Sequence, residues 1–340
     1  MNIYGLTLPQ LEQYLLTIGE KPSKAPLLFH ALYQQDITDF AQLTALNARL
    51  RQHLACDLAL TLPVIIEHQT CDDTDKLLLQ LDDASLIEAV VMRQKYGASL
   101  CLSTQVGCSM GCAFCQSGRF KRTRSLETWE LTAQVIAIQR TLGVRVSNIV
   151  LMGIGEPFDN YDHVMDFLAI VGHPKGLALG RRRLCVSTCG IAPRIRDYGS
   201  HSAAGLLAVS LHAPNDALRQ KLMPIGRRYP LHELMAAIDD YIRLTGKRVM
   251  LEYTLLADVN DSASLAHELA DLIGPLNCHV NLIPYNETQN LGFAKSNPQR
   301  IRAFYDVLKK RGVIVTLRRE FGSALHAACG QLRADYQKRQ

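Results

Sequence analysis

Three cysteines in one short segment constrain this chain more than any other feature. Cys108, Cys112 and Cys115 have the spacing C-x3-C-x2-C, which allows a single loop to bring three thiolates to one centre. The apolar residues 98–103 come directly before them and predict a β-strand, so the loop is expected to follow a strand end. A [4Fe-4S] cluster normally has four cysteine ligands. Three cysteines therefore predict a cluster with one iron left open for another ligand.

Two other interpretations of these cysteines stay open at this level. A structural zinc ion needs four ligands, and the sequence contains no second C-x2-C or H-x3-H pair that would complete such a site. The third interpretation is that the cysteines are unligated residues of the core. The iron–sulfur interpretation is favoured because C-x3-C-x2-C is the signature of the radical S-adenosylmethionine (SAM) enzymes. This resemblance implies that the open iron binds the amino and carboxylate groups of SAM.

The composition is that of a soluble globular protein with a large core. The chain has 340 residues, of which 48% are hydrophobic, and a net charge of +5. No apolar run approaches the ~20 residues that a membrane-spanning helix requires, and the first residues do not resemble a secretory signal. We therefore expect a cytoplasmic protein without a membrane partner. Its ten cysteines are then expected to be metal ligands or catalysts rather than a disulfide framework.

The hydrophobic pattern divides the chain into three parts. Residues 1–57 predict a small helical accessory domain, because apolar residues such as Leu11 and Leu15 recur at helical spacing. Residues 58–97 predict an antiparallel β extension, in which the acidic turns DDTD and DDAS separate short β runs. Residues 98–340 predict a barrel domain that begins with the strand before the cysteines and ends in a C-terminal tail carrying a further cysteine.

The third part alternates strands and helices, which is typical of a parallel α/β sheet. Counting the strand before the cysteines, it contains six strand–helix units, whereas about eight close a full barrel. We therefore predict an α/β fold, a partial and open (β/α)6 barrel of the radical-SAM type. The predicted strands after the cysteine loop cover residues 147–152, 183–188, 205–211, 248–256, 278–283 and 313–317. GIGEP, STCG, SLHAP and PYN each follow one of these strands, as site residues do in parallel sheets.

The ordered set of motifs resembles one group of radical SAM enzymes, the dual-cysteine RNA methyltransferases that methylate an adenine ring carbon in large-subunit ribosomal RNA. The motifs are CLSTQVGCSMGCAFC, MGIGEP, STCG, SLHAPND, EYTLLADVND, VNLIPYN and AACGQL, and the resemblance extends from about residue 5 to about residue 335. One branch of the family methylates carbon 2, and some of its members also act on tRNA. The other branch methylates carbon 8 and gives antibiotic resistance. The loop QSGRFKRTRSL departs from the family pattern, which leaves the choice between these substrates open.

The resemblance implies roles for individual residues. Cys108, Cys112 and Cys115 would ligate the cluster. The residues implied to bind SAM are Gly155, Glu156, Ser187, Ser210, Leu211, His212 and Asn286. The residues implied to be catalytic are Cys101, Cys329 and Glu88, of which Glu88 accepts the ring proton. Without the resemblance, we would interpret Glu88 as a solvent-facing strand residue and the two cysteines as ordinary buried thiols.

The family mechanism, as the resemblance implies it, uses two molecules of SAM. One methylates Cys329, and the other is cleaved at the cluster to a radical that activates this methyl group for addition to the base. Glu88 removes the ring proton. Cys101 then attacks as a thiolate, frees the RNA and leaves a Cys101–Cys329 disulfide that cellular reductants reopen. The resemblance implies an electron donor such as flavodoxin or ferredoxin as a partner, and the protein is expected to act as a monomer.

Basic runs support RNA as the substrate, because an RNA-binding protein neutralises phosphates. The run beside the cluster cysteines, Arg119, Lys121, Arg122 and Arg124, is the best candidate for this contact. Two other classes of function stay open. One is a metal-stabilised RNA-binding module without catalysis, which leaves the remaining cysteines and the strand-end motifs unexplained. The other is a radical SAM enzyme that acts on a non-RNA substrate.

Overall fold

The computed structural model describes the chain apart from residues 120, 288–290, 319–331, 334–335 and 337–340. Its main element is a sheet with the strand order β1-β2-β3-β4-β7-β8-β9-β10-β11-β12. The first strands pair in antiparallel fashion, and they are β1 (Val64–Cys71), β2 (Thr74–Gln80), β3 (Leu86–Gln94) and β4 (Gly97–Cys101). The strands that follow are parallel to β4, and they are β7 (Val146–Leu151), β8 (Leu184–Thr188), β9 (Leu206–Ser210), β10 (Val249–Leu255), β11 (Cys278–Pro284) and β12 (Val315–Leu317).

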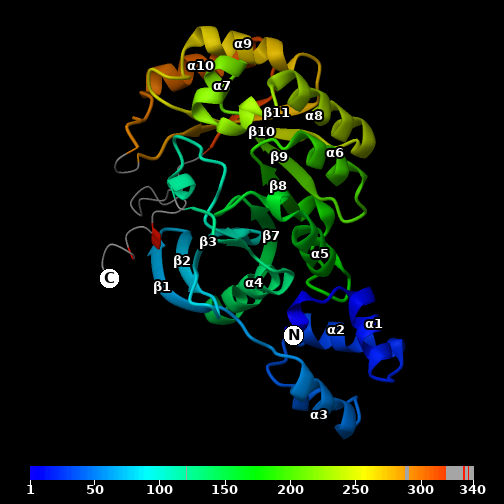
Figure 1. Cartoon of the computed structure of the whole chain (residues 1–340). Coiled ribbons are helices and arrows are strands. Elements are labelled where there is room, and N and C mark those ends of the chain that lie inside the picture. The colour runs from blue at the N-terminus through cyan, green and yellow to red at the C-terminus, as the bar shows by residue number, and fades with distance from the viewer. Residues whose placement is uncertain (120, 288–290, 319–331, 334–335, 337–340) are drawn as a thin grey trace.

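Helices connect the parallel strands and complete six strand–helix units. They are α4 (Thr128–Leu142), α5 (Tyr161–Gly172), α6 (Ala192–Ser200), α7 (Asp216–Leu222), α8 (Leu231–Thr245), α9 (Ala263–Ile273) and α10 (Pro298–Lys310). The sheet begins at β1 and ends at β12, and within the described residues these two edges do not pair, so the barrel is open. Figure 1 shows the sheet as an arc with α6, α8, α9 and α10 along its outer side. The predicted open (β/α)6 arrangement is confirmed.

One helix was not predicted from the sequence. The segment between β8 and β9 forms α6, of which only Ala192, Ile195 and Tyr198 are buried. This short apolar face is too weak a periodic signal to predict a helix. Packing supplies the missing stabilisation, because the ring of Tyr198 stacks on Tyr241 of α8 with centroids 6.0 Å apart, and Arg196 pairs with Asp240 of α8 at 2.7 Å.

The N-terminal segment contains three α-helices, α1 (Leu8–Thr17), α2 (Ala25–Tyr33) and α3 (Ala48–Asp57). Helix α1 begins with a capping box, in which Thr7 and Gln10 exchange hydrogen bonds between side chain and backbone. The helices share a hydrophobic cluster of their own, which also includes Ile136 of α4 and Ile170 of α5. The helical unit therefore packs on the outside of the barrel beside α4 and α5 (Figure 1). The predicted domain boundaries after residues 57 and 97 stay a prediction.

Within the described residues, the protein has no helix that is both long and apolar enough to cross a membrane.

Candidate active site

The loop that carries the three cysteines is closed at its base by a small antiparallel ribbon. Strand β5 (Gln105–Val106) pairs with β6 (Arg124–Ser125), so the loop leaves and re-enters the barrel at the same point. Gly107 and Gly111 have φ angles of 82° and 64°, which favour glycine, and they turn the loop on either side of Cys108. The amide of Cys115 donates to the carbonyl of Cys112 at 3.1 Å. The spacing therefore produces a tight turn, as the sequence predicts.

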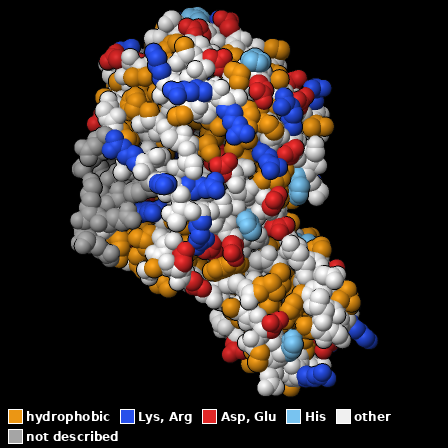
Figure 2. Space-filling view, viewed as in Figure 1, with side chains coloured by type: hydrophobic (Ala, Val, Ile, Leu, Met, Phe, Trp, Pro, Cys, Tyr) orange, Lys and Arg blue, Asp and Glu red, His pale blue; other side chains and the backbone are white. Residues whose placement is uncertain are grey.

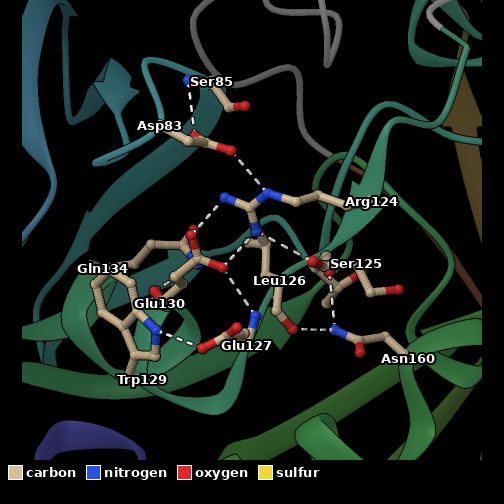
Figure 3. A network of polar contacts seen from close by, with 11 residues as sticks. Asp83, Ser85, Arg124, Ser125, Leu126, Glu127, Trp129, Glu130, Gln134 and Asn160 are labelled. Atoms are coloured by element: carbon tan, nitrogen blue, oxygen red, sulfur yellow. Dashed lines mark hydrogen bonds and ion pairs between the residues drawn. The ribbon is translucent and has the colours of Figure 1, made fainter. Parts of the chain in front are cut away.

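Arg124 holds this base in place (Figure 3). Its guanidinium donates two hydrogen bonds of 2.7 Å to the carboxylate of Glu130 in α4 and one of 2.8 Å to Asp83 in the turn between β2 and β3. The hydrogen bond from Arg124 lowers the pKa of Asp83 to about 2. The sequence predicts Arg124 as a candidate for phosphate contact, but two carboxylates already balance its charge. Arg124 is therefore a structural residue that ties the cysteine loop to α4 and to the β extension.

The chemistry of the three thiols suits an iron–sulfur cluster. Burial raises the pKa of Cys108 to about 11 and raises that of Cys112 further, and neighbouring cysteines add to both shifts. Buried thiols of this kind ionise only when a metal takes them as ligands, because metal binding releases their protons. Among the residues that the structure describes, no group of three or more His, Cys, Asp or Glu side chains converges closely enough to hold a single metal ion.

The cysteines lie at the mouth of a cavity of about 360 Å³ inside the barrel. It opens at the carboxyl ends of the parallel strands, where ligands bind in such folds. Of the predicted site residues, those that line it are Cys101, Cys108, Cys112, Cys115, Gly155, Glu156, Ser187, Ser210, His212 and Asn286. The structure thus brings together residues that are up to 185 positions apart (Cys101 and Asn286, 286 − 101), while their individual roles stay predictions.

Two of the described predicted residues, Leu211 and Glu88, do not line this cavity. Leu211 has a fully buried side chain in the main hydrophobic core, and its amide donates to the carbonyl of Glu252 at 3.0 Å. Glu88 is 3% exposed, so the interpretation as a solvent-facing strand residue was wrong. Its carboxylate pairs with Lys76 at 3.8 Å and accepts a 2.6 Å hydrogen bond from the amide of Arg333. Cys329 lies outside the described residues, so the predicted Cys101–Cys329 disulfide has no structural support.

Glu156 follows β7 and is held rigidly. It is 2% exposed, and its carboxylate accepts hydrogen bonds from the amides of Cys189 and Phe158 at 2.7 and 3.0 Å. Burial raises the pKa of Glu156, and these hydrogen bonds oppose the rise. A buried carboxylate beside a cavity is suited to accept hydrogen bonds from an ammonium group such as that of SAM.

The glycines of GIGEP are required by the packing of the protein itself. A Cβ atom on Gly153 would lie 2.6 Å from the backbone of Leu102, and one on Gly155 would lie 2.7 Å from the side chain of Gln105. Gly155 also has a φ angle of 112°, which side chains rarely adopt. The two glycines therefore let the GIGEP turn pack against the segment that leads from β4 into the cysteine loop.

His212 is neutral and has a fixed tautomer. Its Nδ1 atom accepts a 2.9 Å hydrogen bond from the amide of Thr254, so the ring proton is on Nε2. Burial lowers the pKa of His212 to about 3, with a smaller contribution from Arg219. The ring packs edge-on against Phe114 of the cysteine loop with centroids 4.7 Å apart. His212 can thus offer an N–H donor to a ligand in the cavity at neutral pH.

Sequence reasoning missed polar residues of the cavity wall, among them Glu252 and Lys76. Glu252 is the one with a signal in the sequence, because it is a carboxylate inside the otherwise uncharged strand VMLEYTL of a parallel sheet. Such strands are buried on both faces. A charged residue there has to have a partner or a ligand.

Two family models and a solved structure match this chain, and they agree with the barrel and the three-cysteine loop described above. A model described as the radical SAM superfamily matches residues 102–269, and one described as the ribosomal RNA large subunit methyltransferase N-terminal domain matches residues 1–59. This chain is 42% identical in sequence to a radical SAM methyltransferase from Sphaerobacter thermophilus. The crystal structure of that protein matches this one with a TM-score of 0.91, over 97% of this chain and 98% of that one. The barrel, the three-cysteine loop and the cavity define a radical SAM enzyme, whose cofactors are a [4Fe-4S] cluster and SAM.

Two curated relatives identify the family of this chain within the radical SAM enzymes. The chain is 48% identical to the probable dual-specificity RNA methyltransferase RlmN of Geobacillus kaustophilus (strain HTA426), over 99% of this chain and 93% of that protein. It is 43% identical to the probable dual-specificity RNA methyltransferase RlmN of Thermoanaerobacter sp. (strain X514), over 99% of both chains. This chain belongs to the RlmN family of radical SAM methyltransferases.

Proposed function

We propose that this enzyme transfers a methyl group from SAM to a ring carbon, carbon 2 or carbon 8, of an adenine in RNA. The substrate is 23S rRNA, and tRNA is a second candidate because the relatives are named dual-specificity RNA methyltransferases. The observation that carries the proposal is the position of Cys101, which lines the same cavity as the three cluster cysteines. A thiol outside the cluster spacing but beside the predicted cluster site is what a two-cysteine mechanism requires.

Each cofactor has residues in the cavity that fit it. When bound, SAM supplies the methyl group and the cluster supplies the electron that makes carbon chemistry possible. Cys108, Cys112 and Cys115 hold the cluster. Glu156 and His212 present an acceptor and a donor to SAM, and both are fixed in orientation by backbone hydrogen bonds.

The catalytic residues act in sequence. Cys329 carries the methyl group, and Glu88 takes the ring proton. The Cys101 thiolate then attacks the sulfur of Cys329, so that a disulfide forms, the bond from this sulfur to the methylene carbon breaks, and the carbon takes a proton to become the methyl group of the product. The Nζ atom of Lys76 lies 3.8 Å from the carboxylate of Glu88. The hydrogen bond from Arg333 to Glu88 supports this assignment, because Arg333 follows Cys329 by only four residues (333 − 329). A dithiol then reduces the disulfide that forms.

The partners follow from the same proposal. RNA approaches the open end of the cavity, and Lys and Arg side chains are spread over the face of the barrel seen in Figure 2. Within the cysteine loop, Lys121 and Arg122 are exposed, and Arg122 pairs with Asp159 at 3.4 Å. An electron donor such as flavodoxin or ferredoxin reduces the cluster, and the enzyme works as a monomer in the cytoplasm.

The cysteine pair provides the test. Cys329→Ala should leave both the protein and the RNA unmethylated. Cys101→Ala should stall with RNA covalently attached through Cys329, because no thiolate is available to release it. Mass spectrometry of nuclease-treated protein should find a nucleotide on the Cys329 peptide in the Cys101→Ala variant alone. Cys56→Ala, which changes an exposed cysteine outside the site, is the control and should turn over normally. Absence of the adduct in a folded, cluster-containing Cys101→Ala variant would refute the mechanism.

A further inference from the structure

A row of polar side chains crosses four neighbouring parallel strands inside the barrel. Ser210 of β9 is in register with Glu252 of β10, Glu252 with Asn281 of β11, and Asn281 with Thr316 of β12. Residues in register on parallel strands point to the same face of the sheet. Ser210 and Glu252 line the cavity, while Thr316 at the far end of the row is exposed. Interior positions of a barrel are usually filled by branched apolar residues.

The row is connected by hydrogen bonds that run in one direction. The Thr316 hydroxyl donates to Oδ1 of Asn281 at 3.2 Å, and Nδ2 of Asn281 donates to Oε2 of Glu252 at 2.8 Å. Since the single proton of Thr316 is used in this way, its oxygen accepts the 2.8 Å hydrogen bond from Nε2 of His279. The chain of donors starts at His279 and ends at Glu252. It fixes the orientation of the Asn281 amide and, through it, of the Glu252 carboxylate.

The second oxygen of Glu252 is left for a ligand. Oε1 is buried and has no hydrogen-bond partner within the described residues, and Glu252 as a whole is only 3% exposed. A buried acceptor without a donor is costly, and such groups in native proteins almost always have a partner. Burial raises the pKa of Glu252, while the Asn281 hydrogen bond and the charge of Arg318 oppose this rise. A ligand that donates a hydrogen bond to Oε1 would remove the cost.

We propose that Oε1 of Glu252 accepts a hydrogen bond from a ribose hydroxyl of SAM, with Ser210 beside it as the partner of the adjacent hydroxyl. The strand order separates Glu252 from the strand that leads to Glu156 by three strand spacings, about 14 Å along the sheet. SAM held by its amino acid group at the cluster therefore extends its nucleoside toward β10. The target base has to approach Cys101 on β4 and Glu88 on β3, which is the other side of the barrel.

The inference rests on SAM as the cofactor and not on RNA as the substrate. It is tested by binding alone, so its failure would leave the proposed methyl transfer untouched. The probe is S-adenosylhomocysteine, which has the same amino acid and nucleoside groups as SAM but no methyl group to transfer. Isothermal titration calorimetry on the anaerobic, cluster-containing enzyme gives its dissociation constant. The analogues required are the 2′-deoxy and 3′-deoxy forms and a form that lacks the 6-amino group of the purine.

We expect Glu252→Gln to weaken binding of S-adenosylhomocysteine about 10-fold to 100-fold, the usual loss when a hydrogen bond to a charged group is removed. One of the deoxy analogues should bind the wild type more weakly by a similar factor and show little further loss in the variant. Glu268→Gln is the matched control, because Glu268 is an exposed carboxylate that also accepts a hydrogen bond from an asparagine, Asn215, at 2.8 Å. It should bind the probe like the wild type.

The absorbance of the cluster and the thermal midpoint show whether each variant is intact. If Glu252→Gln does not hold its cluster, Thr316→Val is used in its place. This change removes the hydroxyl that donates to Asn281 and keeps the shape of the side chain, so it should weaken binding of the probe about 2-fold to 5-fold. Any of three results overturns the proposal. The first is an intact Glu252→Gln variant with unchanged affinity for the probe, and the second is that both deoxy analogues bind the wild type as tightly as the parent compound. The third is that removal of the 6-amino group, and not of a ribose hydroxyl, reproduces the loss of affinity seen in Glu252→Gln.

Discussion

Replacement of Arg124 by Gln separates a structural arginine from an RNA-binding one. Arg124 pairs through two hydrogen bonds with Glu130, whose side chain is 3% exposed. Glu130 also accepts a 2.8 Å hydrogen bond from the amide of Glu127 and so caps α4. The Arg124→Gln change leaves a buried carboxylate at the base of the cysteine loop without its cation (Figure 3).

The expected loss of stability has two parts. Breaking a fully buried ion pair costs about 3–5 kcal/mol, but the Arg124 side chain is 32% exposed and water compensates in part, so about 2–3 kcal/mol is expected for the Glu130 contact. For Asp83, the fall of the pKa from 3.8 to about 2 corresponds nominally to about 2.4 kcal/mol. Its side chain is 46% exposed, so solvent screening reduces this to at most about 1 kcal/mol. The total for Arg124→Gln is about 3 kcal/mol.

The pH dependence of the Asp83 part has a definite sign. The folded-state pKa of Asp83 is lower than the unfolded value of 3.8, so its contribution is fully present above about pH 4. It is lost as the pH falls from 3.8 toward 2. Asp83→Asn should remove this part alone and cost at most about 1 kcal/mol at pH 7.

The assay combines urea unfolding at pH 7 with RNA binding at several salt concentrations. Arg124→Gln should lower the free energy of unfolding by about 3 kcal/mol and leave the slope of log affinity against log salt unchanged. Lys121→Gln, an exposed position of the same loop, should do the opposite, with unchanged stability and a slope smaller by about one unit. If Arg124→Gln instead keeps its stability and loses about one unit of slope, Arg124 contacts a phosphate and the structural role is wrong.

Two further predictions concern the cavity. Gly153→Ala should lower the free energy of unfolding by about 1–3 kcal/mol or more in urea unfolding, because the added Cβ would lie 2.6 Å from the backbone of Leu102. Gly180→Ala is the control and should change stability little, since no atom lies within 4 Å of its added Cβ. Equal losses in the two variants would contradict the packing argument. The folded-state pKa of His212, about 3, is below the unfolded value of 6.5, so its contribution to stability should be nearly full at pH 7 and fall by about 2.3 kcal/mol between pH 6.5 and 4.5. A His212→Asn variant should show a shallower fall, and a parallel fall in both proteins would refute the assignment.

Local chemistry accounts for what could be predicted from the sequence. The spacing of Cys108, Cys112 and Cys115 determines that one loop can hold them, because three thiols within eight residues need no other part of the chain to converge. The alternation of strands and helices likewise depends on short-range hydrophobic periodicity, and it predicts the six strand–helix units and the edge of the sheet where the site lies. The exception is α6, which is stabilised mainly by packing on α8 and therefore leaves little trace in its own residues.

Long-range pairing decided the rest. Whether Glu88 faces water or the interior depends on the register of β3 between β2 and β4, and a strand pattern alone does not determine register across a sheet. Arg124 has the same charge as Lys121, yet only the position of Asp83 and Glu130, residues 41 and 6 positions away, makes it a structural residue. Glu252 acquires its open oxygen only because register places Asn281 beside it and the cavity in front of it. The energy of a buried polar group is set by its neighbours in space, and those neighbours exist only in the folded chain.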